Sequence, residues 1–271
     1  MNHTKKQILK RILIFSVCII SVIVIFMPLP PIFNGVGGEQ TAEYLSGIIE
    51  QVVVSVMLIF LLKKMDLLEK AGFKRKSKEL WIIWPIILFM LLNASDFLTG
   101  GLVIDKSKPL LIILFVLLYL STGLVEEALC RGVIFSVMLN KWGKTKNGFY
   151  LAIILSSVMF GLGHFIHYFL GNASLIATVA QVIYASFIGV FFCACVIKNQ
   201  SIYPAIILHG ILDMTGELKE IAVNGGINRE FRTMSVEGAI ICVIIALPLF
   251  LYGLFIVRKE FGKNAICKEK E

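Results

Sequence analysis

Charged residues are scarce in this chain: Asp, Glu, Lys and Arg make up 16% of its 271 residues, against about 25% in soluble globular domains. An apolar fraction of 58% and a mean hydropathy of +0.86 exclude an intrinsically disordered chain. The six cysteines form no disulfide framework, because five lie in apolar runs and Cys267 lies in the charged C-terminal tail. Composition therefore predicts an integral membrane protein.

Several motifs are also missing. No A-x-A-like cleavage site follows the first apolar run, which predicts a membrane helix over 12–33 rather than a signal peptide. The sequence contains neither an HExxH zinc motif nor an internal repeat. Cys193 and Cys195 form a CxC pair, but two such positions lie about 200° apart on a helix and cannot face one metal ion. We therefore interpret these two cysteines as small core residues.

Long apolar segments make up most of the chain. A helix of about 20 residues crosses a bilayer core, and eight segments approach that length, at 12–33, 45–62, 80–98, 109–139, 148–170, 175–197, 202–218 and 236–257. We expect an all-α, polytopic membrane protein with eight transmembrane helices, in which residues 1–271 form a single integral domain.

Basic residues follow the alternation of these segments. With a cytoplasmic N-terminus, 20 Lys and Arg residues fall on the cytoplasmic side and five on the outer side, and Arg131 lies inside an apolar run. This positive-inside bias predicts that both termini are cytoplasmic in a multi-pass protein of the cell membrane. The bias also accounts for the net charge of +8 without a nucleic-acid partner.

Three ionisable residues interrupt the apolar run at 109–139. A charge at the bilayer centre costs about 2.5–3.5 kcal/mol on insertion scales, so Glu126, Glu127 and Arg131 need partners or a function. Arg131 is four residues from Glu127, about 40° around a helix, and should pair with it. Glu126 points about 100° away and is a candidate general base; a purely structural triad is the alternative. Gly123, just before the pair, is a plausible kink site.

Histidines occur on two later segments. Counted from the turn near 141–147, His164 lies at nearly the depth of Glu127, whereas His209, only about nine residues from the turn near Asn199, should lie nearer the membrane surface. Asp213 shares one helix face with His209. Two histidines and an unpaired glutamate are sufficient to activate water and stabilise an oxyanion. His167 is expected to be structural or interfacial.

Three motifs carry a resemblance to a known family. Glu126 to Arg131, Phe160 to His164 and His209 to Asp213 resemble the EExxxR, FxxxH and HxxxN/D motifs of the CPBP family, the CAAX proteases and bacteriocin-processing enzymes also called Abi proteins. The resemblance covers a core at 120–215. It implies an eight-helix intramembrane endopeptidase whose active site opens toward the cytoplasm.

The resemblance also implies roles for these residues. Glu126 and His164 would activate the hydrolytic water, His209 and Asp213 would stabilise the oxyanion, and Glu127 with Arg131 would organise the site. Family members of the CAAX-processing branch carry Asn at the position of Asp213. Because an ionised carboxylate cannot donate a hydrogen bond, Asp213 would instead orient His209. Phe160 is expected to contact the substrate.

The sequence leaves other functions open. The expected partners are the bilayer and a peptide or membrane-protein substrate, without a cofactor. A zinc protease with Glu126, His164 and His209 as ligands is the mechanistic alternative. A non-catalytic scaffold or bacteriocin-immunity protein on the same fold, binding a toxin or a signalling kinase, is the alternative from another class. A proton-coupled transporter is disfavoured because no repeat or broken-helix pair is evident.

Overall fold

The structure is a computed structural model that describes residues 32–261 except 34, 36, 224 and 227–231. Within these ranges the chain is helical, and its β contacts are isolated bridges between Ile104 and Ala222 and between Ala173 and Arg232. The all-α prediction is thus confirmed for the described part of the chain. The predicted first span, Cys18, Cys267 and both termini lie outside the described residues, apart from the last residues of that span.

Five stretches of helix are long and apolar enough to cross a membrane. They are α2 (Glu39–Lys64), α5 to α6 (Pro109–Trp142), α7 to α8 (Lys146–Phe169), α9 (Leu175–Asn199) and α11 (Val236–Arg258). The second consists of α5 (Pro109–Glu127), the π-helical η2 (Ala128–Phe135) and α6 (Ser136–Trp142), and the third of α7 (Lys146–Gly163) and α8 (Phe165–Phe169). Shorter helices are η1 (Leu80–Ile83), α3 (Trp84–Asn93), α4 (Ser95–Leu98), α10 (Tyr203–Gly216) and η3 (Leu218–Ile221). The count of eight spans remains a prediction.

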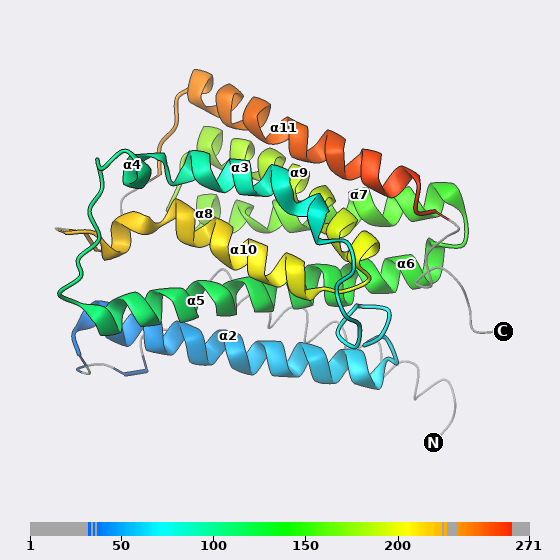
Figure 1. Ribbon diagram of the computed structural model, residues 1–271, viewed down its shortest axis with the longest axis horizontal. Coiled ribbons are helices and arrows are strands. Elements are labelled where there is room, and N and C mark those ends of the chain that lie inside the picture. Colours follow the sequence, from blue (N-terminus) through cyan, green and yellow to red (C-terminus); the bar gives the residue numbers. More distant parts are fainter. Residues whose placement is uncertain (1–31, 34, 36, 224, 227–231, 262–271) are drawn as a thin grey trace.

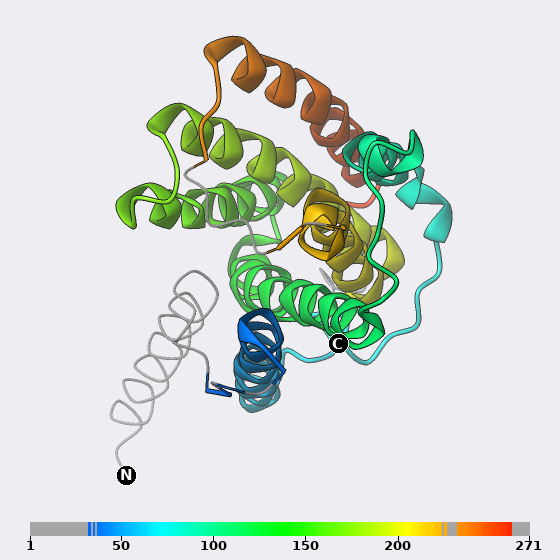
Figure 2. The same cartoon turned by 90° about the vertical axis from the view of Figure 1, so that its left-hand side faces the viewer.

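The helices run roughly along one direction and form two neighbouring groups (Figure 1). Helix α9 packs against α7 and α11 and is the most buried of the long helices, while α5 packs against both α2 and α10. One group contains α2 and α5, and the other contains α7, α9 and α11. Viewed along the helices, α10 lies close to α5 and also to α9 (Figure 2). Helix α10 therefore connects the two groups.

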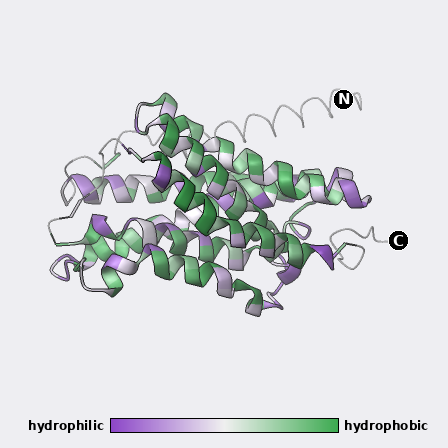
Figure 3. Cartoon of the chain, turned by 90° about the horizontal axis from the view of Figure 1, so that it is seen from above, coloured by the Kyte–Doolittle hydropathy of each residue, from purple (hydrophilic) through white to green (hydrophobic). Residues whose placement is uncertain are grey.

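The helices are hydrophobic along most of their length, and hydrophilic residues gather toward their ends (Figure 3). Large side chains such as Val56, Ile113, Ile244 and Leu251 are more than half exposed. Such a surface is unfavourable in water and suits contact with lipid chains. The packing thus supports the membrane assignment made from composition.

The two ends of the helix bundle differ in charge. At one end α2, α6, α9 and α11 finish, and the described residues there include 13 Lys and Arg and four Asp and Glu. At the opposite end, where α5, α9 and α11 begin, the described residues include four Lys and Arg and seven Asp and Glu. We call these the basic end, on the right of Figure 1, and the acidic end, on its left.

Two glycines allow α5 and α10 to cross at very short distance. A Cβ on Gly123 would lie 2.5 Å from the carbonyl oxygen of Ile206, and one on Gly210 would lie 2.7 Å from that of Tyr119. Small residues permit such approach between membrane helices. The crossing places His209 directly beside the end of α5.

The turn between α9 and α10 is buried at the basic end. Asn199, Ser201 and Ile202 are all fully buried, beneath the segment 65–79. The backbone of Gly72, with φ of +85°, lies so close that a Cβ there would be 2.8 Å from the nitrogen of Ile202. Because this turn is set inside the protein, α10 starts deeper than a surface turn would allow.

Candidate active site

Glu127 and Arg131 form a fully buried ion pair, as their spacing predicts. Nη1 of Arg131 donates to Oε1 of Glu127 at 2.7 Å, and both side chains are at most 1% exposed. The predicted kink near Gly123 is not where the helix changes: α5 continues to Glu127, and the π-helical η2 follows. The π-helical segment therefore begins immediately after the glutamate pair. Such segments are rare and often occur at functional sites.

His209 reaches the same carboxylate from α10. Its Nδ1 lies 2.8 Å from Oε1 of Glu127, so the two side chains are hydrogen-bonded. The expected mismatch in depth between His209 and the glutamates is wrong. Its physical reason is the buried turn before α10 together with the close crossing at Gly123 and Gly210.

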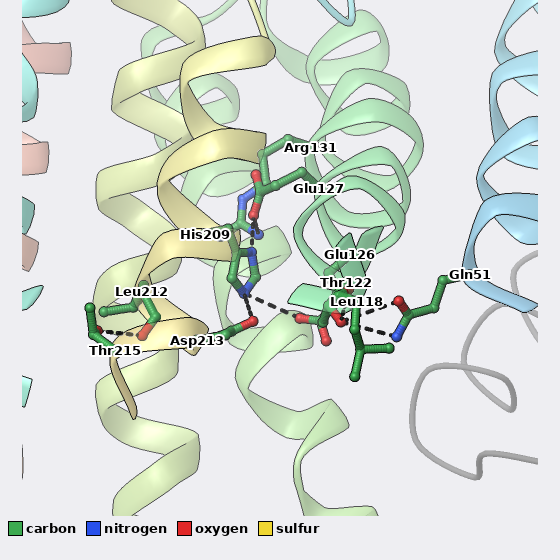
Figure 4. Close-up of polar contacts among 10 residues, drawn as sticks. All are labelled: Gln51, Leu118, Thr122, Glu126, Glu127, Arg131, His209, Leu212, Asp213 and Thr215. Atoms are coloured by element: carbon green, nitrogen blue, oxygen red, sulfur yellow. Dashed lines mark hydrogen bonds and ion pairs between the residues drawn. The ribbon is translucent and has the colours of Figure 1, made fainter. Parts of the chain in front are cut away.

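Glu126 and Asp213 lie on the other edge of the His209 ring. Nε2 of His209 is 3.4 Å from Oε2 of Glu126 and 3.7 Å from Oδ2 of Asp213. Figure 4 shows the imidazole between Glu127 on one side and these two carboxylates on the other. Glu126 is thus not part of a local triad with Arg131, since the side chain that it faces, His209, comes from another helix. Asp213, whose side chain is 29% exposed, faces the ring nitrogen that Glu127 does not occupy.

Aromatic rings enclose the charged residues. The guanidinium carbon of Arg131 lies 4.6 Å from the ring centre of Phe160 and 5.3 Å from that of Phe192. Phe192 stacks on His209, and Phe160 contacts both His209 and His164 edge to face. These contacts fix the imidazole and favour the buried cation. Phe160 is 6% exposed and lines the cavity described next, where its expected contact with a substrate remains a prediction.

A cavity of about 580 Å³ begins at this cluster. Glu126, His164, His209 and Asp213 line it together, so the structure brings four of the expected catalytic residues to one space. His164 caps the C-terminus of α7, and its ring stacks on that of His167 with centres 6.0 Å apart. His167 also lines the cavity, although we expected it to be structural or interfacial.

Sequence reasoning missed several polar residues of this cavity. Gln51 of α2 donates to Thr122 of α5 at 3.0 Å and accepts from Ser121 beside it. Glu50, which is buried, and Arg232, in the segment before α11, line the same space. The occurrence of Glu50 and Gln51 inside an apolar run was the sequence feature that could have identified them as cavity residues. The residues around Arg232 in the sequence contain no comparable feature.

Glu220 anchors the loop that follows α10. Its Oε2 accepts hydrogen bonds from the hydroxyls of Tyr44 at 2.8 Å and Tyr119 at 3.0 Å. Burial raises the pKa of Glu220, and burial also raises the pKa of nearby Glu217. These bonds tie the end of α10 to α2 and α5, and so help to hold His209 and Asp213 in place.

The zinc alternative requires Glu126, His164 and His209 to converge on one ion. Among the described residues, no group of three or more His, Cys, Asp or Glu side chains is placed to hold a metal ion. Glu126, His164 and His209 share the cavity but do not form such a group. Cys130, Cys193 and Cys195 are buried free thiols, as expected for core residues.

Comparison with known proteins supports the motif assignment. Residues 108–215 match the model of the family described as type II CAAX prenyl endopeptidase Rce1-like, which confirms the resemblance to the CPBP family. The match covers less than half of the chain and includes all three motifs. No curated protein and no solved structure shows significant similarity.

Proposed function

We propose that this membrane protein, with its CAAX-endopeptidase-like segment, is an intramembrane endopeptidase of the cell membrane that hydrolyses a peptide bond of a membrane-associated protein or peptide. One observation carries the proposal: Glu126, His164, His209 and Asp213, from three different helices, line one cavity inside the bundle. A family match that spans these same residues supports it.

Glu126 is the proposed general base. It accepts a proton from a water molecule that His164 helps to position, and the resulting hydroxide attacks the scissile carbonyl carbon. The tetrahedral intermediate breaks its C–N bond as Glu126 returns the proton to the leaving amine. One water is consumed, and one carboxyl and one amino terminus are formed.

His209 is the proposed oxyanion donor. Because Glu127 is paired with Arg131, it accepts the Nδ1 proton of His209 and leaves Nε2 as the nitrogen that faces the cavity. In the imidazolium form of His209 both ring nitrogens carry a proton, so Nε2 can donate to the oxyanion while Nδ1 donates to Glu127. Asp213 lies 3.7 Å from Nε2, so it contributes by holding the ring and its proton rather than by donating itself.

The substrate has to be locally unwound. Backbone groups of a membrane helix are hydrogen-bonded within the helix, which shields the scissile carbonyl from attack. A flexible segment or a helix end is therefore the expected site of cleavage.

Protein termini in cells test this proposal without a purified substrate. New N-termini in the membrane and secreted fractions are compared by mass spectrometry for cells with the wild type, with Glu126→Gln and with a surface control, Glu237→Gln. We expect termini that occur with the wild type and the control and are lost with Glu126→Gln. If the wild type and cells without the protein give the same termini, a scaffold or immunity role replaces the protease.

A further inference from the structure

The cavity opens toward one end of the bundle. Its most exposed lining residues are Asn93, Leu170, Asn172, Gly216 and Arg232. All five lie at helix ends or in loops of the acidic end. The lining includes no residue from the segments that join helices at the basic end. The mouth of the cavity is therefore at the acidic end.

The distribution of Lys and Arg tells the two ends apart. Thirteen basic residues at the basic end against four at the acidic end, among described residues, is a strong positive-inside bias. This bias places the basic end in the cytoplasm. The mouth then faces the opposite side of the membrane, contrary to the cytoplasmic opening that the family resemblance implies.

The cavity also has a distinct charge. Six carboxylates line it, from Glu43, Glu50, Glu126, Asp213, Glu217 and Glu220. The basic side chains of the lining are Arg232, which pairs with Glu217 at 3.1 Å, and the three histidines His164, His167 and His209. Acidic side chains therefore outnumber basic ones, and a cleft with low-dielectric walls and an excess of one sign of charge concentrates ligands of the opposite sign.

The depth of the cavity limits the shape of the substrate. Tyr119, near the mouth, and Glu126, at the cluster, are seven residues apart on α5, which is about 10 Å of helix. About three extended residues span that distance. A helix with side chains is about 10–12 Å wide and does not fit beside the lining residues in this volume. An extended segment does.

We propose that the cavity is reached from the extracytoplasmic side and accepts an extended, positively charged segment of a peptide or protein. This inference rests on the proposed function for its catalytic consequence. It names the side of access and the substrate class that the proposed function leaves open.

Thiol labelling in intact cells tests the side of access. Two exposed asparagines form a matched pair: Asn172 at the mouth and Asn147 at the basic end. A membrane-impermeant sulfonatoethyl methanethiosulfonate is added to cells with Asn172→Cys or Asn147→Cys, with the wild type as background for the native cysteines. We expect Asn172→Cys to react in intact cells and Asn147→Cys to react only after permeabilisation. The reverse pattern would overturn the proposal and establish a cytoplasmic mouth.

A second arm tests the charge preference. Gln181 lines the cavity, and Gln181→Cys is reacted in detergent with trimethylammonioethyl and sulfonatoethyl methanethiosulfonates. We expect the ratio of cationic to anionic rates to exceed that of a free thiol in solution by about tenfold and to fall with added salt. A ratio equal to or below that of the free thiol would remove the cationic substrate class.

These readouts are independent of proteolysis. A protein that labels as expected but cleaves nothing would contradict only the proposed function. A protein that cleaves while Asn147→Cys reacts from outside would contradict only the inference on access.

Discussion

Nδ1 of His209 is hydrogen-bonded to Oε1 of Glu127 at 2.8 Å, and the same oxygen accepts from Arg131 at 2.7 Å. One carboxylate atom therefore joins α10 to α5 and η2 in the bundle interior. The contact turns Nε2 of His209 toward Glu126 and Asp213 and thereby sets the geometry of the candidate site.

Glu127→Ala should destabilise the protein strongly. The change leaves the Arg131 cation buried without its carboxylate, and breaking a buried pair costs about 3–5 kcal/mol. The expected result is a lower folded yield and a lower unfolding temperature in detergent. Glu126→Ala is the matched control, with a smaller expected loss; equal stability of the two variants would contradict the pairing of Glu127 with Arg131 as a major source of stability.

The crossing of α5 and α10 should tolerate no added methyl group. A Cβ at position 210 meets the α5 backbone at 2.7 Å, and overpacking costs about 1–3 kcal/mol. We expect Gly210→Ala to lower the unfolding temperature, while Gly216→Ala on the same helix, whose Cβ meets nothing within 4 Å, leaves it unchanged. Similar melting of both variants would show that the two helices can move apart at little cost.

Replacement of Asp213 separates orientation from proton donation. Asp213→Asn keeps the side-chain shape and adds an amide donor, as in the CAAX-processing branch that the motifs resemble, so we expect cleavage within about tenfold of the wild type. Asp213→Ala should reduce kcat by about 10–100-fold, because His209 loses the carboxylate that holds its ring. If the alanine variant is as active as the asparagine variant, Asp213 has no role at this step.

Activity should not depend on zinc. We expect purified, active protein to contain much less than one zinc per chain and to be inhibited weakly by chelators. The measurement is elemental analysis combined with cleavage before and after chelation. Loss of about one zinc per chain together with activity, and recovery on readdition, would reverse the choice of mechanism while keeping Glu126, His164 and His209 as site residues.

The sequence predicted those features that depend on residues close together along the chain. Apolar runs predicted the long helices α2, α5, α7, α9 and α11, whereas the segments 80–98 and 202–218 contain the shorter helices α3 and α10. The four-residue spacing predicted the ion pair of Glu127 with Arg131. The depth of His209 could not be counted along the chain, because the turn at 199–202 is buried by a segment 120 or more residues earlier. Likewise Gln51, Glu220 and Arg232 reach the cavity only through packing between distant elements.

The role of Glu126 is tested most sharply by cleavage of the substrate found by terminal analysis, using purified wild type, Glu126→Gln and Glu237→Gln in detergent or lipid vesicles. Because the amide retains the shape of Glu126 but cannot accept a proton from water, the proposed mechanism predicts a fall in kcat of at least about 10²-fold for Glu126→Gln, with unfolding temperature unchanged and Glu237→Gln fully active. Cleavage by Glu126→Gln at near the wild-type rate would contradict the assignment of Glu126 as the base that activates water.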